Sequence, residues 1–429
     1  MLGVGFGVAV AVGNTIGAGI LRAPGEVAEQ LPHSGFFLAV WVIGALYALL
    51  GAAQIAELGA MIPRSGGQYV FSRYALGEYA GFVVSWSDWI STCGTTAAVS
   101  IVAAEFAAVL LPGLVGWRPA LAASVAVAFA AIQWRGIGWG SLVQNVTSAI
   151  KAIAFVALSA SAFLLGSYAG GAGSGGRLMP TGFTLLTAFL VSLQAVIYTF
   201  DGWTGVVYFS EEVDNPGLNV PKALFAGVLS ISAIYLLMNL SLLYLLPTSA
   251  IAGQPFAAGA LAEMTFGRHG STVFTVVVIL SMLSAINAYH LMASRVLFAM
   301  SRDGLVSPKA APVNAGGTPT RALLLSAVVS VLFIAFGRTF ENVITVLAFF
   351  FVANYTLSFV SVFVLRHREP EKARPYRAWC YPWSTAVALV CSLAFLLGAV
   401  AGDTRNSAIA LLVLAASYPV FRVMKSWPW

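Results

Sequence analysis

Long hydrophobic segments, separated by short polar connections, follow one another along almost the whole chain. A helix needs about 20 consecutive apolar residues to cross the hydrocarbon core of a bilayer, and about twelve segments come near that length. We therefore predict twelve transmembrane helices joined by short loops. Their approximate bounds are 2–21, 36–62, 80–110, 119–134, 141–165, 184–210, 222–246, 271–299, 320–336, 341–365, 382–401 and 406–422.

The composition agrees with a membrane protein. Hydrophobic residues make up 59% of the 429 residues and charged residues only 9%, whereas a soluble domain carries about 25% charged residues. The spans leave no room for a soluble domain, so we predict one all-α, polytopic transmembrane domain over residues 1–429. The first hydrophobic run lacks a basic flank and a cleavage site, and we interpret it as a transmembrane helix rather than a signal peptide.

The basic residues indicate how the chain is oriented. With the N-terminus in the cytoplasm, 14 of the 22 Lys and Arg residues fall in inside loops and 6 in outside loops, while Lys151 and Arg295 lie within spans. Cytoplasmic loops carry the excess of basic residues in membrane proteins. We therefore expect both termini in the cytoplasm, in a plasma membrane of the bacterial inner-membrane type. The net charge of +6 reflects topology and not nucleic-acid binding.

The first span contains a break in its helical pattern. The sequence GNTIGAG, from Gly13 to Gly19, places three glycines and the polar Asn14 and Thr15 inside an apolar run. Glycine costs about 1 kcal/mol relative to alanine within a helix, and free backbone groups at membrane depth are tolerated only where protein or a water-filled cavity covers them. Amides at the start of the second half-helix would form a site for a carboxylate. The alternative is a glycine patch for close helix packing.

The sixth span repeats this anomaly, because YTFDGWTG, from Tyr198 to Gly205, places an acid, glycines and hydroxyls in an apolar run. The breaks lie five helices apart, so the second set of five helices enters the membrane from the opposite side, as in an inverted repeat. Amphipathic connections at Gln68–Tyr79 and Pro255–Gly267 occupy corresponding places. We predict one repeat over about 2–165, a second over about 184–365, two extra helices over about 382–422, and a binding site between the breaks near the midplane.

Lys151 lies about ten residues from either end of the fifth span, too deep to reach the membrane surface easily. A lysine at the midplane costs about 2.5–3.5 kcal/mol on insertion scales and normally marks function; the alternative is an error in the predicted span. Asp201 could carry a proton, bind an amine or cap the following half-helix, and we favour the cap. Other ionisable residues in or near spans are interpreted as structural or interfacial: Glu57, Asp88, Glu105 and His290.

These features favour a secondary transporter that moves its broken helices against a scaffold. A channel would need a repeated filter or a charged ring, and an enzyme would need convergent catalytic groups or metal ligands; the sequence offers neither. Cys93 and Cys391 lie in spans and Cys380 in a basic loop, so no disulfide framework, metal site or cofactor is expected. A sodium- or proton-coupled symporter of amino acids or amines stays open as the alternative.

Several motifs together resemble those of the amino acid/polyamine/organocation superfamily, and most closely its L-type amino acid transporter branch. The resemblance covers most of the chain and is carried by GNTIGAGIL, AELGAMIPRSGGQYVF, VQNVTSAIK, YTFDGWTGVVYFSEEVDNPGLNVPKAL, SRVLFAMSRDG and LRHREPEKARPYRAWCYP. It implies the inverted five-helix repeat of the leucine-transporter type and sodium-independent amino acid transport, by a permease or an exchanger, through alternating access. We expect neutral amino acids as substrates.

The resemblance also implies roles for residues at both breaks. Amides of residues 17–19 would bind the substrate carboxylate, carbonyls around residues 198–201 would bind its amino group, and Tyr198 would close over it. The Lys151 ammonium would take the place of sodium, contacting carbonyls near Gly13 to Ile16 and a hydroxyl of the eighth span, Ser284 before Ser281. The expected site residues are Thr15, Ile16, Gly17, Ala18, Gly19, Tyr198, Thr199, Phe200 and Asp201, with Lys151, Ser284 and Tyr198 in gating or ion substitution.

Two features depart from that branch. Its heteromeric members hold a single-span partner through a cysteine in the outer loop between spans 3 and 4, whereas the loop LPGLVGW has no cysteine. We therefore expect no disulfide-linked subunit. The first span also begins almost at the first residue, so gating by a cytoplasmic tail is not expected.

Overall fold

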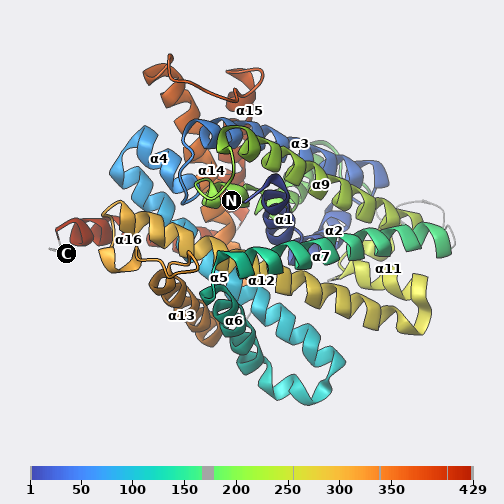
Figure 1. Ribbon diagram of the computed structural model, residues 1–429. Helices are drawn as coiled ribbons and strands as arrows, with labels where there is room; N and C mark the ends of the chain where they lie inside the picture. The colour runs from blue at the N-terminus through green and yellow to red at the C-terminus, as the bar shows by residue number, and fades with distance from the viewer. Residues whose placement is uncertain (1, 167–177, 255, 338–339, 403, 427–429) are drawn as a thin grey trace.

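The computed structural model describes residues 2–166, 178–254, 256–337, 340–402 and 404–426. Within these ranges the regular elements are helices joined by short connections (Figure 1). The predicted spans correspond in order to α1 (Val4–Thr15) with α2 (Ala18–Gln30), α3 (Ser34–Met61), α5 (Glu78–Leu110), α6 (Arg118–Trp134), α7 (Ile137–Leu165), α8 (Gly182–Phe200) with η2 (Trp203–Phe209), α9 (Pro216–Leu245), α12 (Gly270–Arg302), α13 (Thr320–Gly337), α14 (Phe340–Arg368), α15 (Trp383–Gly402) and α16 (Thr404–Ser426).

Helix length and hydropathy confirm the predicted all-α, polytopic class. Ten helices in the described ranges are long and apolar enough to cross a membrane, and the pair α1 and α2, bent by 49°, makes an eleventh. The helix α13 is shorter but apolar, and it lies where the ninth span was predicted. The connections hold the short helices α4 (Gln68–Leu76), α10 (Thr248–Ile251), α11 (Ala257–Phe266), η1 (Pro112–Trp117), η3 (Gly267–His269) and η4 (Pro308–Ala310).

The largest error in the predicted bounds concerns the first span, which was ended at residue 21 although α2 continues to Gln30. The polar residues that suggested an end belong to one side of an amphipathic helix. Leu21 and Val27 are buried on its other side, while Glu26 and Gln30 are exposed. A helix with one polar face can therefore continue past the apolar run.

The short helices α4 and α11 lie where the two amphipathic connections were predicted. One follows α3 and the other follows α9, which are the positions that an inverted repeat requires. The repeat itself stays a prediction.

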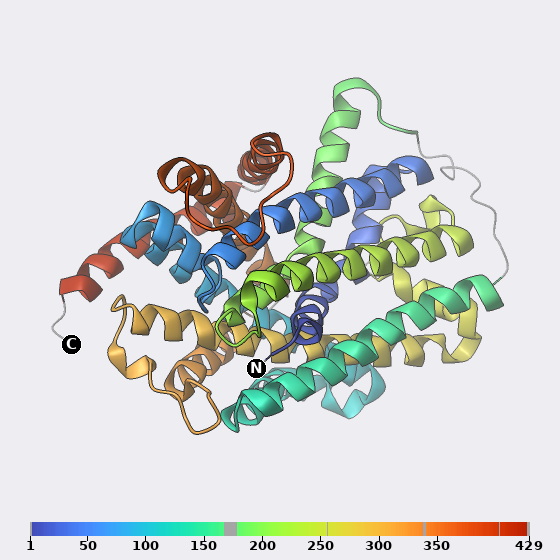
Figure 2. The ribbon, with the colours of Figure 1, turned by 45° about the horizontal axis from the view of Figure 1, so that its top comes forward.

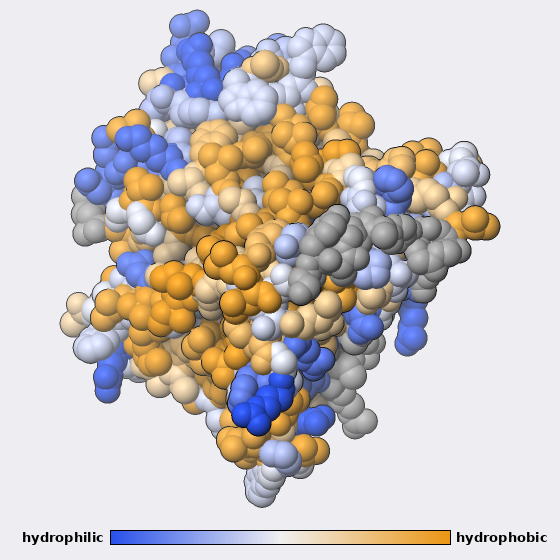
Figure 3. All heavy atoms as spheres, turned by 90° about the vertical axis from the view of Figure 1, so that its right-hand side faces the viewer, coloured by the Kyte–Doolittle hydropathy of each residue, from blue (hydrophilic) through white to orange (hydrophobic). Residues whose placement is uncertain are grey.

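The helices differ strongly in burial. In the most apolar 18-residue stretch of each span, 72% of the residues are buried in the span of α5 and 61% in the span that contains α12. The corresponding share is only 22% in the span that contains α6 and in α16. Large apolar side chains such as Leu164, Leu397 and Leu412 are exposed. Figure 3 shows one face on which hydrophobic side chains cover a broad area, with hydrophilic ones mostly toward its margins. Such a surface suits contact with lipid.

The short helix α1 lies in the middle of the bundle, where α7, α9, α12 and η2 pack against it (Figures 1 and 2). Just before it, the Leu2 amide donates to the Glu212 carbonyl at 2.7 Å and the Asp214 amide donates to the Leu2 carbonyl at 2.9 Å. The segment before α1 is thereby tied to the segment after η2. The two interrupted helices are joined at that end.

Candidate functional site

The two predicted breaks are present, and they cross. The helix α1 ends at Thr15 and α2 begins after Gly17, while α8 ends at Phe200 before the left-handed Gly202 (φ 107°). A Cβ atom on Gly202 would lie 2.8 Å from the Cβ atom of Asn14. Both the positive φ and this close approach require glycine at residue 202. The backbone of one break therefore packs directly against the other.

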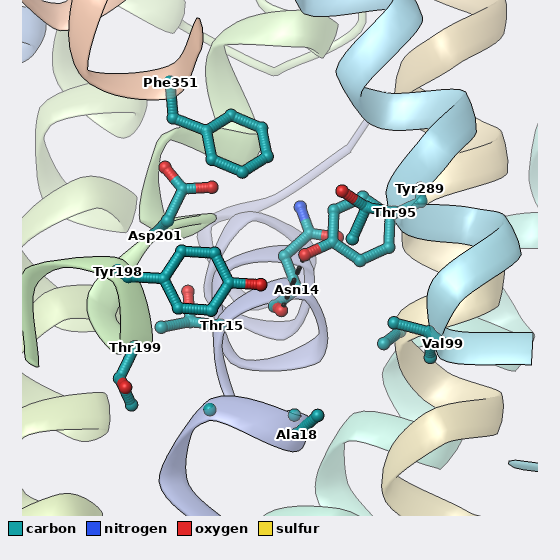
Figure 4. A pocket seen from close by; sticks show the side chains of 13 residues that line it. Asn14, Thr15, Ala18, Thr95, Val99, Tyr198, Thr199, Asp201, Tyr289 and Phe351 are labelled. Atoms are coloured by element: carbon teal, nitrogen blue, oxygen red, sulfur yellow. Dashed lines mark hydrogen bonds between the residues drawn. The ribbon is translucent and has the colours of Figure 1, made fainter. Parts of the chain in front are cut away.

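A cavity of about 40 Å³ lies at this crossing (Figure 4). The space for one water takes about 10–15 Å³ of such a cavity, so this one has room for a few waters or for part of a small solute. The walls come from both breaks and from α5, α12 and α14. They comprise Asn14, Thr15, Gly17, Ala18, Gly19, Thr95, Val99, Tyr198, Thr199, Asp201, Ala285, Tyr289 and Phe351.

The start of α2 presents backbone donors to this cavity. The first amides of a helix have no partner within it, and no side chain caps α2. In the described part of the chain the amides of Gly17, Ala18 and Gly19 form no hydrogen bond. All three residues line the cavity. Such an arrangement of amides binds anionic groups.

Seven of the nine predicted substrate residues line the cavity, but Ile16 and Phe200 do not. The Ile16 side chain is fully buried and its carbonyl accepts hydrogen bonds from the scaffold. The Phe200 ring packs edge-to-face on Tyr235 at 5.0 Å. Because successive residues of a helix point in different directions, a continuous run of sequence cannot all face one cavity.

Tyr235 of α9 joins the two breaks. Its hydroxyl lies 2.7 Å from the carbonyl oxygen of Thr15 and 2.9 Å from that of Thr199. The Tyr198 carbonyl accepts from the Asp201 amide at 3.0 Å. The carbonyls expected near a substrate amino group are thus already bonded, although each keeps a second lone pair.

One face of α7 holds the backbone of α1. Gln144, Ser148 and Lys151 follow each other at helical spacing, so their side chains project from one side of α7. Gln144 and Ser148 both donate to the Ala9 carbonyl, at 3.1 and 2.7 Å. Lys151 donates to the carbonyls of Gly13 and Ile16, at 2.8 and 2.6 Å. The carbonyls freed by the break are therefore held by a buried ammonium group.

Among the described residues, neither serine named as a partner of Lys151 forms a hydrogen bond with it. Ser281 donates to the Ile16 carbonyl at 2.9 Å, the same oxygen that Lys151 contacts. Ser284 lies 3.1 Å from the Ser148 hydroxyl instead, and among the described residues it forms no hydrogen bond with Lys151. The error is one of register, since the two serines lie about one helical turn apart on α12.

Asp201 lies in the wall of the cavity and does not form the favoured cap. Its carboxylate accepts a hydrogen bond from the Tyr355 hydroxyl at 2.5 Å and another from the Gly202 amide, and it also lines the cavity. The favoured cap is not formed as expected, because the N-cap residue of η2 is Gly202 and no side chain caps this helix. Figure 4 shows Asp201 between Tyr198 and Phe351.

The sequence did not single out several wall residues as site residues: Asn14, Thr95, Val99, Ala285, Tyr289 and Phe351. Asn14 was noted only as part of the break. Thr95 belongs to a run of small polar residues in the middle of the third span, and that run is a usable signal. Apolar residues such as Val99 and Ala285 look like any other position in a span, so only the packing reveals them.

Charged residues away from the cavity form ion pairs. Glu57 is buried and pairs with Arg366 at 2.6 Å and with Arg374 at 3.2 Å, as its structural interpretation suggested. At the end of α12, Asp303 pairs with Arg64 at 3.1 Å and with Arg73 at 2.9 Å.

The Tyr69 hydroxyl of α4 also donates to Asp303, at 2.8 Å. Burial and the negative charge of Asp303 raise the pKa of Tyr69. These contacts tie α4 and the segment after α3 to the end of α12. They lie on the side of the molecule that was predicted to face the cytoplasm.

Comparison with known proteins agrees with this geometry. The sequence model of a protein family described as "Amino acid permease" matches residues 7–418. The serine/threonine exchanger SteT of Bacillus subtilis (strain 168) is 26% identical over 99% of this chain and 96% of its own length. The b(0,+)-type amino acid transporter 1 of Homo sapiens is 27% identical over 88% of this chain and 78% of its own length. The Asc-type amino acid transporter 1 of Mus musculus is 28% identical over 86% of this chain and 71% of its own length.

These relatives are transporters and not enzymes. The family match extends from α1 into α16 and so includes both breaks and the cavity between them. The chain therefore belongs to the amino acid permease family and is a multi-pass membrane transporter of amino acids.

Proposed function

We propose that the chain exchanges small neutral amino acids by alternating access and does not use sodium. The observation that carries the proposal is the cavity at the crossing of the two breaks, with the amides of Gly17 to Gly19 along one wall. The relative named as a serine/threonine exchanger, which this chain covers over 96% of its length, supports the same activity.

The cavity offers groups for both ends of an amino acid. The amides at the start of α2 suit a carboxylate. The second lone pairs of the Tyr198 and Thr199 carbonyls and the carboxylate of Asp201 suit an ammonium group. Asp201 is the single acid in the described lining, so after the amino group is bound no second carboxylate is left for a cationic side chain.

The size of the cavity favours small side chains. Its volume is about 40 Å³, and Tyr198, Tyr289 and Phe351 form large parts of its wall. Val99 and Ala285 add an apolar wall without charge. Alanine, serine and threonine fit such a space better than tryptophan or arginine.

The position of Lys151 supports sodium independence, because its ammonium already contacts the carbonyls that a sodium ion would need. For the whole molecule we propose cytoplasmic termini in a plasma membrane, an inverted repeat over about 2–165 and about 184–365, and no disulfide-linked subunit. The basic residues and the corresponding places of α4 and α11 support this arrangement.

Uptake of radiolabelled serine into proteoliposomes tests the proposal. We expect uptake that requires serine or alanine inside, is competed by alanine and threonine, and is unchanged when choline replaces sodium. Amines without a carboxylate and tryptophan should compete poorly. Sodium-stimulated uptake would support the symporter alternative, and preference for arginine over alanine would contradict neutral selectivity. A thermal-shift screen can select substrates first, because a ligand at 100 times its Kd adds about 2.7 kcal/mol of stability.

A further inference from the structure

Asp88 is a buried carboxyl group in α5 that the proposed substrate site does not use. Asp88 is only 4% exposed to solvent, and it does not line the cavity. The nearest lining residue on the same helix is Thr95, two turns or about 10 Å away. In the proposed orientation, Asp88 lies between the cavity and the cytoplasmic surface. An ionisable group buried at this depth is expensive and usually functional.

A single hydroxyl group contacts both oxygens of this carboxyl group. The Tyr208 hydroxyl of η2 lies 2.9 Å from Oδ1 and 2.8 Å from Oδ2 of Asp88. A hydroxyl has one hydrogen, so it can donate a full hydrogen bond to only one of the two oxygens. A protonated Asp88 satisfies both contacts, because it accepts from Tyr208 at one oxygen and donates to the phenol oxygen from the other.

No cation in the described chain balances a negative charge on Asp88. Charged and titratable groups on the helices packed against α5 are directed elsewhere, and a negative charge on Asp201 would disfavour a second one on Asp88. On α12, Arg295 pairs with Glu212, the Tyr289 hydroxyl donates to the Asn14 carbonyl, and His290 forms no bond to Asp88. On α4, Arg73 and Tyr69 bind Asp303, on α14 Tyr355 binds Asp201, and on α16 Lys425 pairs with Glu78. The basic residues of α6 and α13 lie only at or just beyond the helix ends, at Arg118, Arg135 and Arg321.

The Asp88–Tyr208 pair joins two parts that move against each other in alternating access. Asp88 belongs to the long buried helix α5, and Tyr208 belongs to the short helix η2 after the second break. Movement of η2 away from α5 would separate the pair and admit water to Asp88. A carboxyl group in water is ionised at neutral pH.

We propose that Asp88 is a proton-binding site, protonated while the Tyr208 hydroxyl of η2 contacts it and ionised when η2 moves away, so that pH biases the movement of η2 that exchange requires. This proposal rests on the proposed transport function. The proton binds one oxygen of the Asp88 carboxylate and leaves from the same group, so the cycle needs no other reactant. Lys151 holds the first break, while Asp88 links the position of the second break to pH.

Infrared difference spectra of the purified protein test the protonation directly and do not depend on transport. Lowering and raising the pH, or adding serine, should change the C=O band of a buried carboxylic acid in the wild type. That band should be absent in Asp88→Asn and should remain in Asp214→Asn, which removes an exposed acid. A band that is unchanged in Asp88→Asn would overturn the assignment.

Serine-loaded proteoliposomes with a trapped pH-sensitive dye, which reports the internal pH, test the link between pH and exchange. Changing the internal pH should change the rate of serine exchange several-fold with the wild type and with Asp214→Asn. Asp88→Asn should still exchange serine but lose this response, and Tyr208→Phe should shift the pH dependence. Serine exchange at a rate that does not depend on pH, or a full response in Asp88→Asn, would refute the link. Absence of transport for every amino acid at every pH would instead refute the proposed function.

Discussion

The two helix breaks meet at one cavity but are stabilised by different kinds of groups. At the first break the scaffold binds backbone carbonyls, through Lys151, Ser281 and Tyr235. At the second break Tyr235 also binds a backbone carbonyl, that of Thr199, but side chains of the break itself make further contacts, as in the pairs of Asp201 with Tyr355 and of Tyr208 with Asp88.

This difference separates two tasks. A backbone held by fixed donors keeps its shape whatever the side chains are, which suits the recognition of the carboxylate common to all amino acids. A break held through ionisable side chains responds to the protonation of those groups. The first break is therefore expected to determine binding and the second to determine selectivity and regulation.

The largest effect is expected from Gly17→Val. A Cβ atom on Gly17 meets no atom within 4 Å, so the valine side chain would extend into the cavity and displace the substrate without a clash in the fold. Uptake of serine should be abolished while the thermal stability stays close to that of the wild type. Gly5→Val is the matched control on α1, since residue 5 is exposed and also open. Wild-type affinity in Gly17→Val would place the carboxylate elsewhere.

Lys151→Ala should reduce transport strongly, since it removes two hydrogen bonds from a charged donor. Such bonds contribute about 1.5–3 kcal/mol, and about 1.4 kcal/mol corresponds to a tenfold change, so we expect a loss of about 10- to 100-fold in initial rate. Expression and folding should be largely kept. Lys222→Ala, which removes an exposed lysine of α9, is the control and should transport normally. Wild-type kinetics in Lys151→Ala would mean that the first break does not need its ammonium group.

Gly202→Ala should mainly affect stability. The left-handed conformation costs an alanine about 1–2 kcal/mol, and its Cβ atom would press against Asn14 at 2.8 Å. The unfolding temperature should fall measurably, in contrast to Gly17→Ala, where the added atom meets open space. Equal stability of the two variants would show that the breaks do not pack as tightly as described.

Asp201→Asn should have the smallest effect on rate and the clearest effect on selectivity. The amide can still bond to Tyr355, but it carries no charge for an ammonium group. We expect serine transport to fall only a few-fold, with alanine, serine and leucine still better competitors than arginine and lysine. If wild-type protein prefers arginine and Asp201→Asn loses that preference, Asp201 binds a cationic side chain and the second break selects charge.

The sequence was sufficient for the spans and for both breaks, because each rests on local pattern. Twenty apolar residues or a glycine-rich interruption can be recognised without knowing the neighbours. The contact of Lys151 with the first break was also predicted, through the resemblance of its motif. The end of α2 at Gln30 was missed because a polar face resembles a loop when only hydropathy is considered.

The sequence could not predict contacts between distant segments. Tyr235 bonds to both breaks, yet a tyrosine in an apolar span has no distinguishing neighbours in sequence. Ser281, and not Ser284, shares the Ile16 carbonyl with Lys151, and this depends on a rotation of α12 that hydropathy does not fix. Asp88 was interpreted as structural because its partner, Tyr208, lies 120 positions further along the chain.

The buried ammonium group of Lys151 also sets a thermodynamic limit. A sodium ion that enters on one side and leaves on the other releases energy stored in its gradient, whereas the ammonium of Lys151 is covalently attached and returns to its starting place after every turnover. Its contacts can lower barriers within the cycle, but they perform no net work. Any accumulation of substrate above equilibrium must therefore be driven by a second solute that does cross the membrane, which in an exchanger is the amino acid moving outward.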